Sequence, residues 1–453
     1  MKTVTRFALS IGAVALFAAC GGSQLPISAP GATPQTSTVV PARAGAGLTR
    51  LAWSHQVLYA FDLQPQNEGS GEPLGGLLDV NGTLYGTTYY GTGGPRGRKC
   101  PEARSCGTVY SLTTTGEYKT LHAFHGGARD GALPRAGLID VNGTLYGTTE
   151  SGGSGCGCGT VYSISTSGAE KALYSFAGGS DGANPTQGDL LYMKGTLYGT
   201  TSKGGSSGCS SGEGCGTVYS VTTSGKEKVL HSFGSGDDGA DPEWGLINVK
   251  GKMYGTTVGG GAHLCGSVVS RGCGTVYRIS TSGVEKVLYS FAGGSDGATP
   301  YGGLIDVEGM LYGTTALGGA GACGGTQSSC GTVYSITTTG QEKVLHSFQG
   351  GSHGLNPVGS LIGVNGKLYG VTAGTIAIAP LRGASGKALD RCGMSCGTVF
   401  SVTTTGEEKA LYRFAGGADG YQPDAALINV NGTLYGTTYY GGKGWGTIFA
   451  LFP

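Results

Sequence analysis

The sequence predicts an all-β protein, a seven-bladed β-propeller with four antiparallel strands in each blade. One segment, LYGTT or a near copy, recurs at intervals of roughly 58 residues. Around each copy the apolar residues alternate with polar ones and are β-branched or aromatic, which is typical of strands. A lone four-stranded sheet cannot bury both faces and a row of seven would leave open edges, so we expect a closed ring. The seven copies start at Leu84, Leu145, Leu197, Met253, Leu311, Leu368 and Leu434.

Turn residues divide each repeat into four strands. In the second copy the first run, residues 137–141, meets Asn142-Gly143, a pair typical of tight two-residue hairpins, and TLYGTT follows. A third run, GTVYS, is joined to a fourth, EKxLYSF, by TTTG or TSG, with glycine where a left-handed backbone is needed. Each repeat is therefore expected to form an antiparallel meander.

The two ends of the repeat region predict how the ring closes. Residues 56–61 match a fourth strand, whereas residues 446–451 match a third strand that has no fourth strand after it. We therefore expect the N-terminal strand to complete the last blade. Fourth strands carry lysines, which commonly protect exposed sheet edges, and this places fourth strands at the rim. These lysines are Lys119, Lys171, Lys228, Lys286, Lys343 and Lys409.

The recurrent string LYGTT...GGxxxxGTVYSxTTxGxEKxLYSFxGGxDGxxP resembles the repeat of the bacterial choice-of-anchor family, the GloVer-type repeat surface proteins. The blades are also similar to kelch blades, although the glycine doublet, as in Gly152-Gly153, lies in the following loop instead of closing the second strand. The resemblance covers residues 57–453. It implies a repeat architecture held at the cell surface by an anchor that differs between members, and it implies no activity.

The N-terminal region predicts a lipid anchor. Residues 1–20 combine a short basic start, an apolar run and small residues before Cys20, and they resemble a bacterial lipoprotein signal peptide. Residues 21–52 are rich in Gly, Ser, Pro, Ala and Thr and are expected to form a disordered tether before the propeller of residues 53–453. We therefore expect Cys20 to be lipidated and the protein to lie at the outer membrane or cell surface, held to the bilayer by acyl chains alone.

Composition excludes one large class of partner. The chain has 29 Lys and Arg against 28 Asp and Glu, and charged residues make up only 13% of it. Such a balance gives no general attraction to nucleic acid, so none is expected as a partner. Glycine, at 92 of 453 residues, falls at fixed turn positions within the period and marks tight loops.

Twelve further cysteines occur as one pair in the loop between second and third strands of six repeats. A zinc site usually needs four ligands at regular spacing, whereas these pairs lie in separate blades at variable separations. We therefore expect local disulfides formed in an oxidising compartment, with no metal and no cofactor. The pairs are Cys100/Cys106, Cys156/Cys158, Cys209/Cys215, Cys265/Cys273, Cys323/Cys330 and Cys392/Cys396.

An Asp-Gly pair recurs in the loops that leave the fourth strands. Aspartate before glycine commonly forms a turn by bonding its own backbone, and the alternative is a role in binding calcium or sugar hydroxyls. Outer-strand histidines, His122, His231 and His346, take a position held by tyrosine in other repeats and are expected to be structural. The repeated loop aspartates are Asp130, Asp181, Asp238, Asp296 and Asp419.

The repeat is broken where the ring is expected to close. The first and last copies read TTYYG, and the last copy has Trp445 in a short loop in place of a cysteine loop. Long basic loops flank it, with Arg96 and Arg98 in the first copy. Aromatic rings stack on sugars and arginines pair with carboxylates or sulfates, so this region is a candidate site for an acidic glycan. The alternative is that the aromatic residues brace the ring closure. The candidate residues are Tyr89, Tyr90, Arg96, Arg98, Tyr439, Tyr440 and Trp445.

Three functions remain open at this point. A surface-tethered module that binds an acidic glycan or another envelope polymer is favoured, because no nucleophile, base and orienting group stand out together. A structural or protein-interaction scaffold of the envelope is the main alternative. A polysaccharide lyase or hydrolase that uses axial carboxylates is the third, and it predicts carboxylate, histidine and arginine together at one mouth of the channel. Polar residues at one position of the innermost strands, including Asp79 and Asp140, could also line a wet channel or bind a cation.

Overall fold

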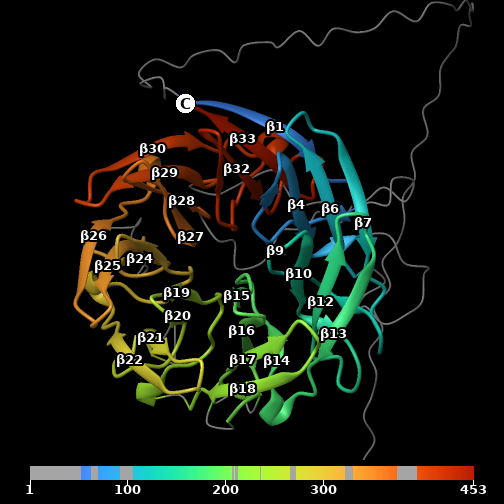
Figure 1. The fold of residues 1–453 in the computed structure, drawn as a ribbon. Helices are drawn as coiled ribbons and strands as arrows, with labels where there is room; N and C mark the ends of the chain where they lie inside the picture. The colour runs from blue at the N-terminus through green and yellow to red at the C-terminus, as the bar shows by residue number, and fades with distance from the viewer. Residues whose placement is uncertain are drawn as a thin grey trace, which may run out of the picture. The chain divides into compact units, whose positions relative to one another are not determined.

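The computed structural model describes residues 53–62, 70–91, 106–206, 209, 213–234, 236–265, 272–321, 330–374 and 395–453. These residues form seven four-stranded antiparallel sheets arranged around one axis (Figure 1). The predicted seven-bladed propeller is confirmed. Blades are numbered 1 to 7 in chain order, from the sheet that contains β3 to the sheet that contains β31.

Each blade runs from a short strand at the axis to a strand at the rim (Figure 1). The innermost strands are β3 (Leu78–Val80), β9 (Ile139–Val141), β15 (Leu191–Met193), β19 (Ile247–Val249), β23 (Ile305–Val307), β27 (Pro357–Val364) and β31 (Ile428–Val430). The second strands are β4 (Thr83–Thr88), β10 (Thr144–Thr149), β16 (Thr196–Lys203), β20 (Lys252–Thr257), β24 (Met310–Thr315), β28 (Lys367–Thr372) and β32 (Thr433–Thr438).

The third and outer strands complete the blades. The third strands are β6 (Thr108–Thr113), β12 (Thr160–Ser165), β17 (Thr217–Thr222), β21 (Thr275–Ile279), β25 (Thr332–Thr337), β29 (Thr398–Thr403) and β33 (Thr447–Phe452). The outer strands are β7 (Tyr118–Ala123), β13 (Glu170–Ser175), β18 (Glu227–Ser232), β22 (Glu285–Ser290), β26 (Glu342–Ser347), β30 (Glu408–Arg413) and β1 (Ser54–Ala60).

Short elements occupy the connections. Two-residue strands pair as β2 (Ser70–Gly71) with β5 (Tyr90–Gly91) and as β8 (Gly131–Ala132) with β11 (Ser151–Gly152). A three-residue strand, β14 (Ala183–Pro185), pairs with β16. Single 3-10 turns follow five of the outer strands. They are η2 (Gly179–Asp181), η3 (Gly236–Asp238), η4 (Gly294–Asp296), η5 (Gly351–His353) and η6 (Gly417–Asp419).

The repeated residues have clear structural roles. Asn142 and Gly143 both take a left-handed backbone, with φ of 54° and 82°, as the predicted hairpin requires. The glycine of LYGTT makes room for the next strand, because a Cβ at Gly313 would lie 2.5 Å from the hydroxyl of the buried Tyr334. Threonines of the second and third strands hydrogen-bond across each blade, as Thr315 does to Thr332 at 2.7 Å.

The last blade takes its outer strand from the N-terminal end of the propeller. β1 pairs antiparallel with β33, from Ser54 opposite Phe452 to Ala60 opposite Thr447. His55 occupies the position that glutamate holds in most other outer strands. It contacts Asp419, with Nδ1 3.1 Å from Oδ1, and stacks on Tyr412 at 4.2 Å between ring centroids. The chain thus joins its first and last described strands in one sheet.

Neighbouring blades are tied together by the residue that precedes a recurrent proline. This residue has a left-handed backbone in all seven blades, although none of the seven is glycine. Its N–H donates to a carbonyl of the preceding blade's loop, and that carbonyl belongs to the second cysteine of each described loop or, at the ring closure, to Trp445. Because the same tie recurs, residues just after the proline lie at equivalent places around the axis. The seven residues are Glu72, Leu133, Asn184, Asp241, Thr299, Asn356 and Gln422.

No helix among the described residues has the length and apolar character needed to span a membrane.

Candidate functional site

Charged and aromatic side chains from different blades meet near the axis. The residue directly after the recurrent proline is apolar in blades 1 and 6, where it is Leu74 and Val358. In blades 2, 4, 5 and 7 it is Arg135, Glu243, Tyr301 and Asp424. We call these four residues, together with Glu150 and Tyr89 from the ends of two second strands, the axial cluster.

Arg135 links the members of the axial cluster. Its Nε lies 3.7 Å from an oxygen of Glu150 and its Nη1 lies 3.8 Å from an oxygen of Glu243. Tyr89 donates its hydroxyl to the same Glu150 oxygen at 3.0 Å. Glu150 belongs to blade 2 and Glu243 to blade 4, so the guanidinium reaches past the blade that separates them. Residues distant in the chain therefore form one polar site.

The protein environment shifts the ionisation of this cluster. Burial alone would lower the pKa of Arg135, but the negative charges of Glu243 and Glu150 raise it, so the guanidinium stays charged. Burial raises the pKa of Asp424 to about 6 and also raises that of Glu243, with Arg135 opposing both changes. Raised carboxyl pKa values beside a fixed positive charge are typical of functional sites.

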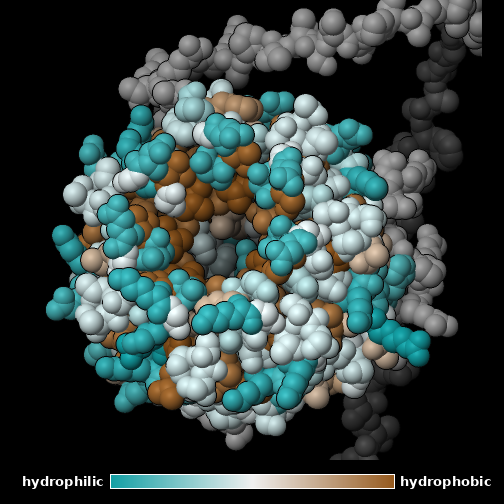
Figure 2. Space-filling model, viewed as in Figure 1, coloured by the Kyte–Doolittle hydropathy of each residue, from teal (hydrophilic) through white to brown (hydrophobic). Residues whose placement is uncertain are grey.

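A cavity of about 240 Å³ lies at the axis. No member of the axial cluster lines it, but residues close to two of them in the chain do. Its walls include Trp244, which follows Glu243 in the chain, and Ala426, which lies two residues after Asp424. The other lining residues come from blades 1, 3, 4, 5 and 6 and are mostly glycine and leucine. Figure 2 shows the hollow at the centre of the ring.

Several polar atoms around the axis have no hydrogen-bond partner among the described residues. They include the indole N–H of Trp244, the Oε1 of Gln187 and the hydroxyls of Thr314 and Thr437. Asp189 is exposed to the channel, yet partial desolvation by its walls raises the pKa of its carboxyl to about 6, against a hydrogen bond from the Gly137 backbone. Buried polar groups are normally satisfied, so the indole N–H, the amide oxygen and the two hydroxyls are available to a polar ligand or to water.

A family profile identifies the repeat. Residues 48–269, 101–326 and 157–378 each match the Gloeobacter/Verrucomicrobia repeat, and together these matches span well over half of the chain. The chain belongs to the Gloeobacter/Verrucomicrobia repeat family. The predicted GloVer-type resemblance is therefore confirmed. No curated protein matches the sequence.

Solved structures align with this Gloeobacter/Verrucomicrobia repeat protein at low identity and with TM-scores below 0.5. A luciferin-regenerating enzyme is 11% identical with a TM-score of 0.39, over 89% of this chain and 96% of that one. A putative gluconolactonase is 10% identical with a TM-score of 0.38, over 89% and 92% of the two chains. A gluconolactonase from Xanthomonas campestris is 12% identical with a TM-score of 0.36, over 64% and 78%.

The aromatic residues predicted as a glycan site gather around a buried glutamate. Tyr439 donates its hydroxyl to the Glu72 side chain at 2.8 Å, and the Trp445 carbonyl accepts the Glu72 N–H at 2.7 Å. Tyr89 and Tyr90 contact each other edge to face, as do Tyr439 and Tyr440. These contacts favour the alternative role, a brace for the ring closure. Arg96 and Arg98 lie outside the described residues.

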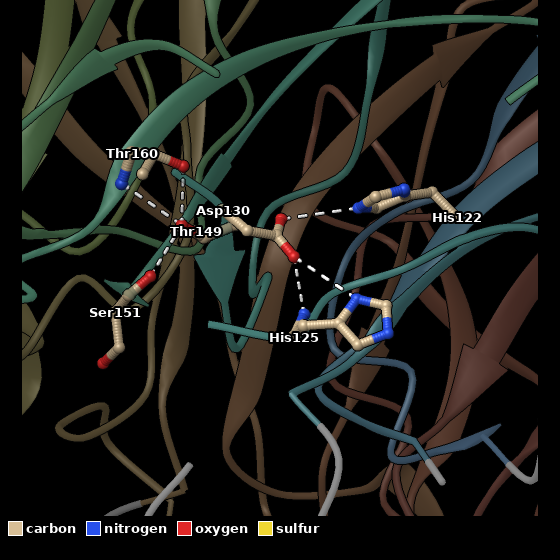
Figure 3. A network of polar contacts seen from close by, with 6 residues as sticks. All are labelled: His122, His125, Asp130, Thr149, Ser151 and Thr160. Atoms are coloured by element: carbon tan, nitrogen blue, oxygen red, sulfur yellow. Dashed lines mark hydrogen bonds and ion pairs between the residues drawn. The ribbon is translucent and has the colours of Figure 1, made fainter. Parts of the chain in front are cut away.

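The loop aspartates accept hydrogen bonds from their own exit loop and from the outer strand before it. In blade 2, Asp181 accepts the Ala177 N–H at 2.6 Å and the Tyr174 hydroxyl at 2.7 Å. Asp238, Asp296 and Asp419 repeat this arrangement, with His231 in place of tyrosine at Asp238. Asp130 likewise accepts the His125 N–H at 2.6 Å and lies 3.4 Å from His122 Nε2, and the His125 ring lies beside it as well (Figure 3). Each outer-strand partner thus locks its own exit loop.

The polar residues of the innermost strands also close turns. Asp79, Asp140, Asn248, Asp306 and Asn429 each accept the N–H of the glycine three residues later, at 2.8 to 3.1 Å. Those hydrogen bonds account for the polar residue at this position without a ligand.

The cysteines that the structure describes are all in disulfides. Cys156–Cys158, Cys209–Cys215 and Cys265–Cys273 are bonded as predicted. Cys106, Cys330 and Cys396 are also disulfide-bonded, whereas Cys100, Cys323, Cys392 and Cys20 lie outside the described residues.

Proposed function

We propose that this protein is a surface-tethered binding module that takes a hydroxyl-rich ligand, a glycan of the envelope or of its surroundings, at the axial cluster. The observation that carries the proposal is the convergence of Arg135 and Glu150 from one repeat with Glu243 from another, beside a cavity. A purely structural repeat would need no such departure from its pattern at the axis.

The chemistry of the axial cluster favours sugar hydroxyls. Carboxylates accept hydrogen bonds from hydroxyl groups, and Arg135 donates them. Trp244 lines the axial cavity with an apolar ring, and its indole N–H has no hydrogen-bond partner among the described residues. The three carboxyl groups of the cluster outnumber its one guanidinium, so the described residues favour a neutral ligand over a strongly anionic one. An acidic glycan would depend on the loop that carries Arg96 and Arg98.

The tether is part of the proposal. The sequence up to Cys20 supports processing and acylation of that cysteine, which would hold the propeller at the outer membrane or cell surface. Labelling of cells with a radioactive fatty acid tests this point. We expect label on the wild-type chain and none on Cys20→Ser, and equal labelling of the two would contradict the lipid anchor.

Binding is tested on an array of neutral and acidic envelope and plant polysaccharides. Tyr301→Phe removes one hydroxyl from the axial cluster, and Arg135→Ala removes the link between its carboxylates. We expect the wild type to retain a neutral glycan more tightly than either variant. The affinity of Arg135→Ala should be at least about tenfold lower, because one charged hydrogen bond contributes about 1.5–3 kcal/mol. Arg129→Ala, in an exposed loop at the rim, is the matched control.

The array also separates the competing functions. Retention without product over a turnover assay supports a binding module, whereas product release would favour a lyase or hydrolase. The axial cluster brings carboxylate and arginine together, but no described histidine belongs to it, so the enzyme hypothesis lacks the base that it predicts. If the wild type binds no glycan on the array, the proposal is contradicted and an envelope scaffold is favoured.

A further inference from the structure

The third repeat departs from the other six where its chain approaches the axis. The residue that pairs with the tyrosine of LYGTT lies five residues after the recurrent proline in six blades. In blade 3 it lies six residues after it, from Pro185 to Leu191. Counted back from the paired residue, Asp189 takes a position that is glycine, serine or alanine in every other blade. Those six residues are Gly76, Gly137, Gly245, Gly303, Ser360 and Ala426.

The longer connection of blade 3 is bonded to two other blades. The buried Gln187 donates its Nε2 to the Leu74 carbonyl of blade 1 at 3.0 Å. The Gln187 backbone N–H donates to the Glu243 carbonyl of blade 4 at 3.1 Å. Asp189 accepts a hydrogen bond from the Gly137 backbone, and a Cβ at Gly137 would lie 2.7 Å from Oδ1 of Asp189. The carboxylate of Asp189 is therefore held at the axis by the segment that carries it and by the neighbouring blade.

Asp189 gives the axial cavity its charge. Of the described residues that line this cavity, only Asp189 is charged, and only Ser360 and Trp244 add polar side-chain atoms. Asp189 is exposed to the channel, and none of the ion pairs among the described residues involves it. A negative charge in a cavity with apolar walls raises the local concentration of positive groups. The cavity therefore favours a cationic ligand.

The other lining residues favour an organic cation over a bare metal ion. Calcium takes about six to eight oxygen ligands, whereas Asp189 is the one carboxylate on this wall. Trp244 lines the cavity, and an indole ring attracts an ammonium group to its face. The Trp244 N–H has no hydrogen-bond partner among the described residues, and Ser360 offers a hydroxyl. These groups suit a ligand that carries both an ammonium group and hydroxyls.

We propose that the axial cavity binds the ammonium group of an amino sugar, so that the preferred glycan contains hexosamine units with free amino groups. This inference rests on the proposed function and names its substrate class. Asp189 accepts hydrogen bonds from the ammonium group, while Trp244 packs against the sugar. Asp189 also adds a fourth carboxyl group to the three of the axial cluster, which have only Arg135 to balance them. A positive charge on the glycan is therefore favoured.

The test compares two oligosaccharides of equal length by calorimetry with the full chain. They are a glucosamine hexamer and the same hexamer after N-acetylation, which removes the positive charges and keeps the rings. We expect the wild type to bind the glucosamine hexamer at least about tenfold more tightly. Asp189→Asn keeps the size of the side chain and should remove this preference. Asp237→Asn makes the same change in an exposed loop at the rim, and this control should keep the preference.

The outcomes separate this inference from the proposed function. If the wild type binds the two hexamers equally, or binds neither while the array retains another glycan, the amino-sugar inference is wrong and the proposed function stands. A preference that Asp189→Asn retains would also overturn the inference, because it would assign the ammonium group to another part of the chain. A wild type that binds neither hexamer and no glycan on the array would contradict the proposed function itself.

Discussion

Glutamates at the start of the outer strands predict that the propeller loses stability as the pH rises from about 4.5 to about 7. Burial raises the pKa of Glu170, Glu227, Glu285 and Glu342 to about 7. At Glu227 the carboxylate of Asp181 raises it further, because a protonated glutamate can donate a hydrogen bond to that carboxylate. The folded state therefore holds a proton that the unfolded chain releases near its ordinary pKa.

The sign and size of this effect follow from proton linkage. A folded-state pKa above the unfolded value stabilises the protein fully below the unfolded pKa, and the contribution is lost as pH rises through the folded pKa. A shift from about 4.5 to about 7 in a fully buried group would be worth more than about 3 kcal/mol. Because these side chains are only half-buried, solvent screening reduces this to about 1 kcal/mol each. Four residues together give about 4 kcal/mol, or about 5 °C in melting temperature for a domain of this size.

Thermal unfolding between pH 4.5 and 7.5, with a chelator present, measures the effect. The matched variant replaces all four glutamates by glutamine, which keeps the shape of the protonated side chain and cannot ionise. We expect the wild type to lose stability relative to the variant over this range. Glutamine at the exposed Glu117 and Glu407 controls for the chemical change itself. An equal difference between wild type and variant at pH 4.5 and 7.5 would refute the reasoning.

Three further predictions concern the fold. Gly313→Ala should lower the free energy of unfolding by more than about 2 kcal/mol, because the new Cβ would lie 2.5 Å from the Tyr334 hydroxyl. Gly76→Ala is the control and should be tolerated, because its Cβ would have its nearest neighbour at 3.9 Å. An equal loss of stability in the two variants, measured by thermal unfolding, would contradict this packing. Replacing Cys265 and Cys273 by serine should lower the free energy of unfolding by about 2 kcal/mol. An unchanged melting temperature would show that this disulfide does not stabilise the fold. Deleting residues 53–62 removes β1 and the fully buried Phe61, and so exposes the edge of β33. Exposed strand edges pair with other chains, so size-exclusion chromatography should detect oligomers. A stable monomer would argue against ring closure by β1.

The sequence was sufficient to predict the blades because each one repeats the same local pattern. Alternation, Asn-Gly turns and the LYGTT spacing act within one repeat of about 58 residues, and the fold multiplies that unit seven times. The role of Glu227 was not predicted. A Glu-Lys pair is typical of a solvated hairpin. In the structure only the lysine is exposed, and the Glu227 side chain lies beside Asp181 of the neighbouring blade.

The axial cluster could not be predicted from spacing, because Arg135, Glu243, Tyr301 and Asp424 lie in four different repeats. Only the closed ring brings them together. A signal for them was nevertheless present, since each directly follows the recurrent proline at a position that is apolar in blades 1 and 6. The predicted aromatic residues, including Tyr439, do meet in space, but around Glu72 as a brace.

The fluorescence of Trp244 tests the central claim most directly, because this residue lines the axial cavity. The chain has three tryptophans, so Trp53→Phe with Trp445→Phe leaves Trp244 as the only one. Titration with the neutral glycan that the array retains should change the Trp244 emission saturably, with the same midpoint as binding measured by calorimetry. Saturated binding without any change in that emission would mean that the ligand binds away from the axis.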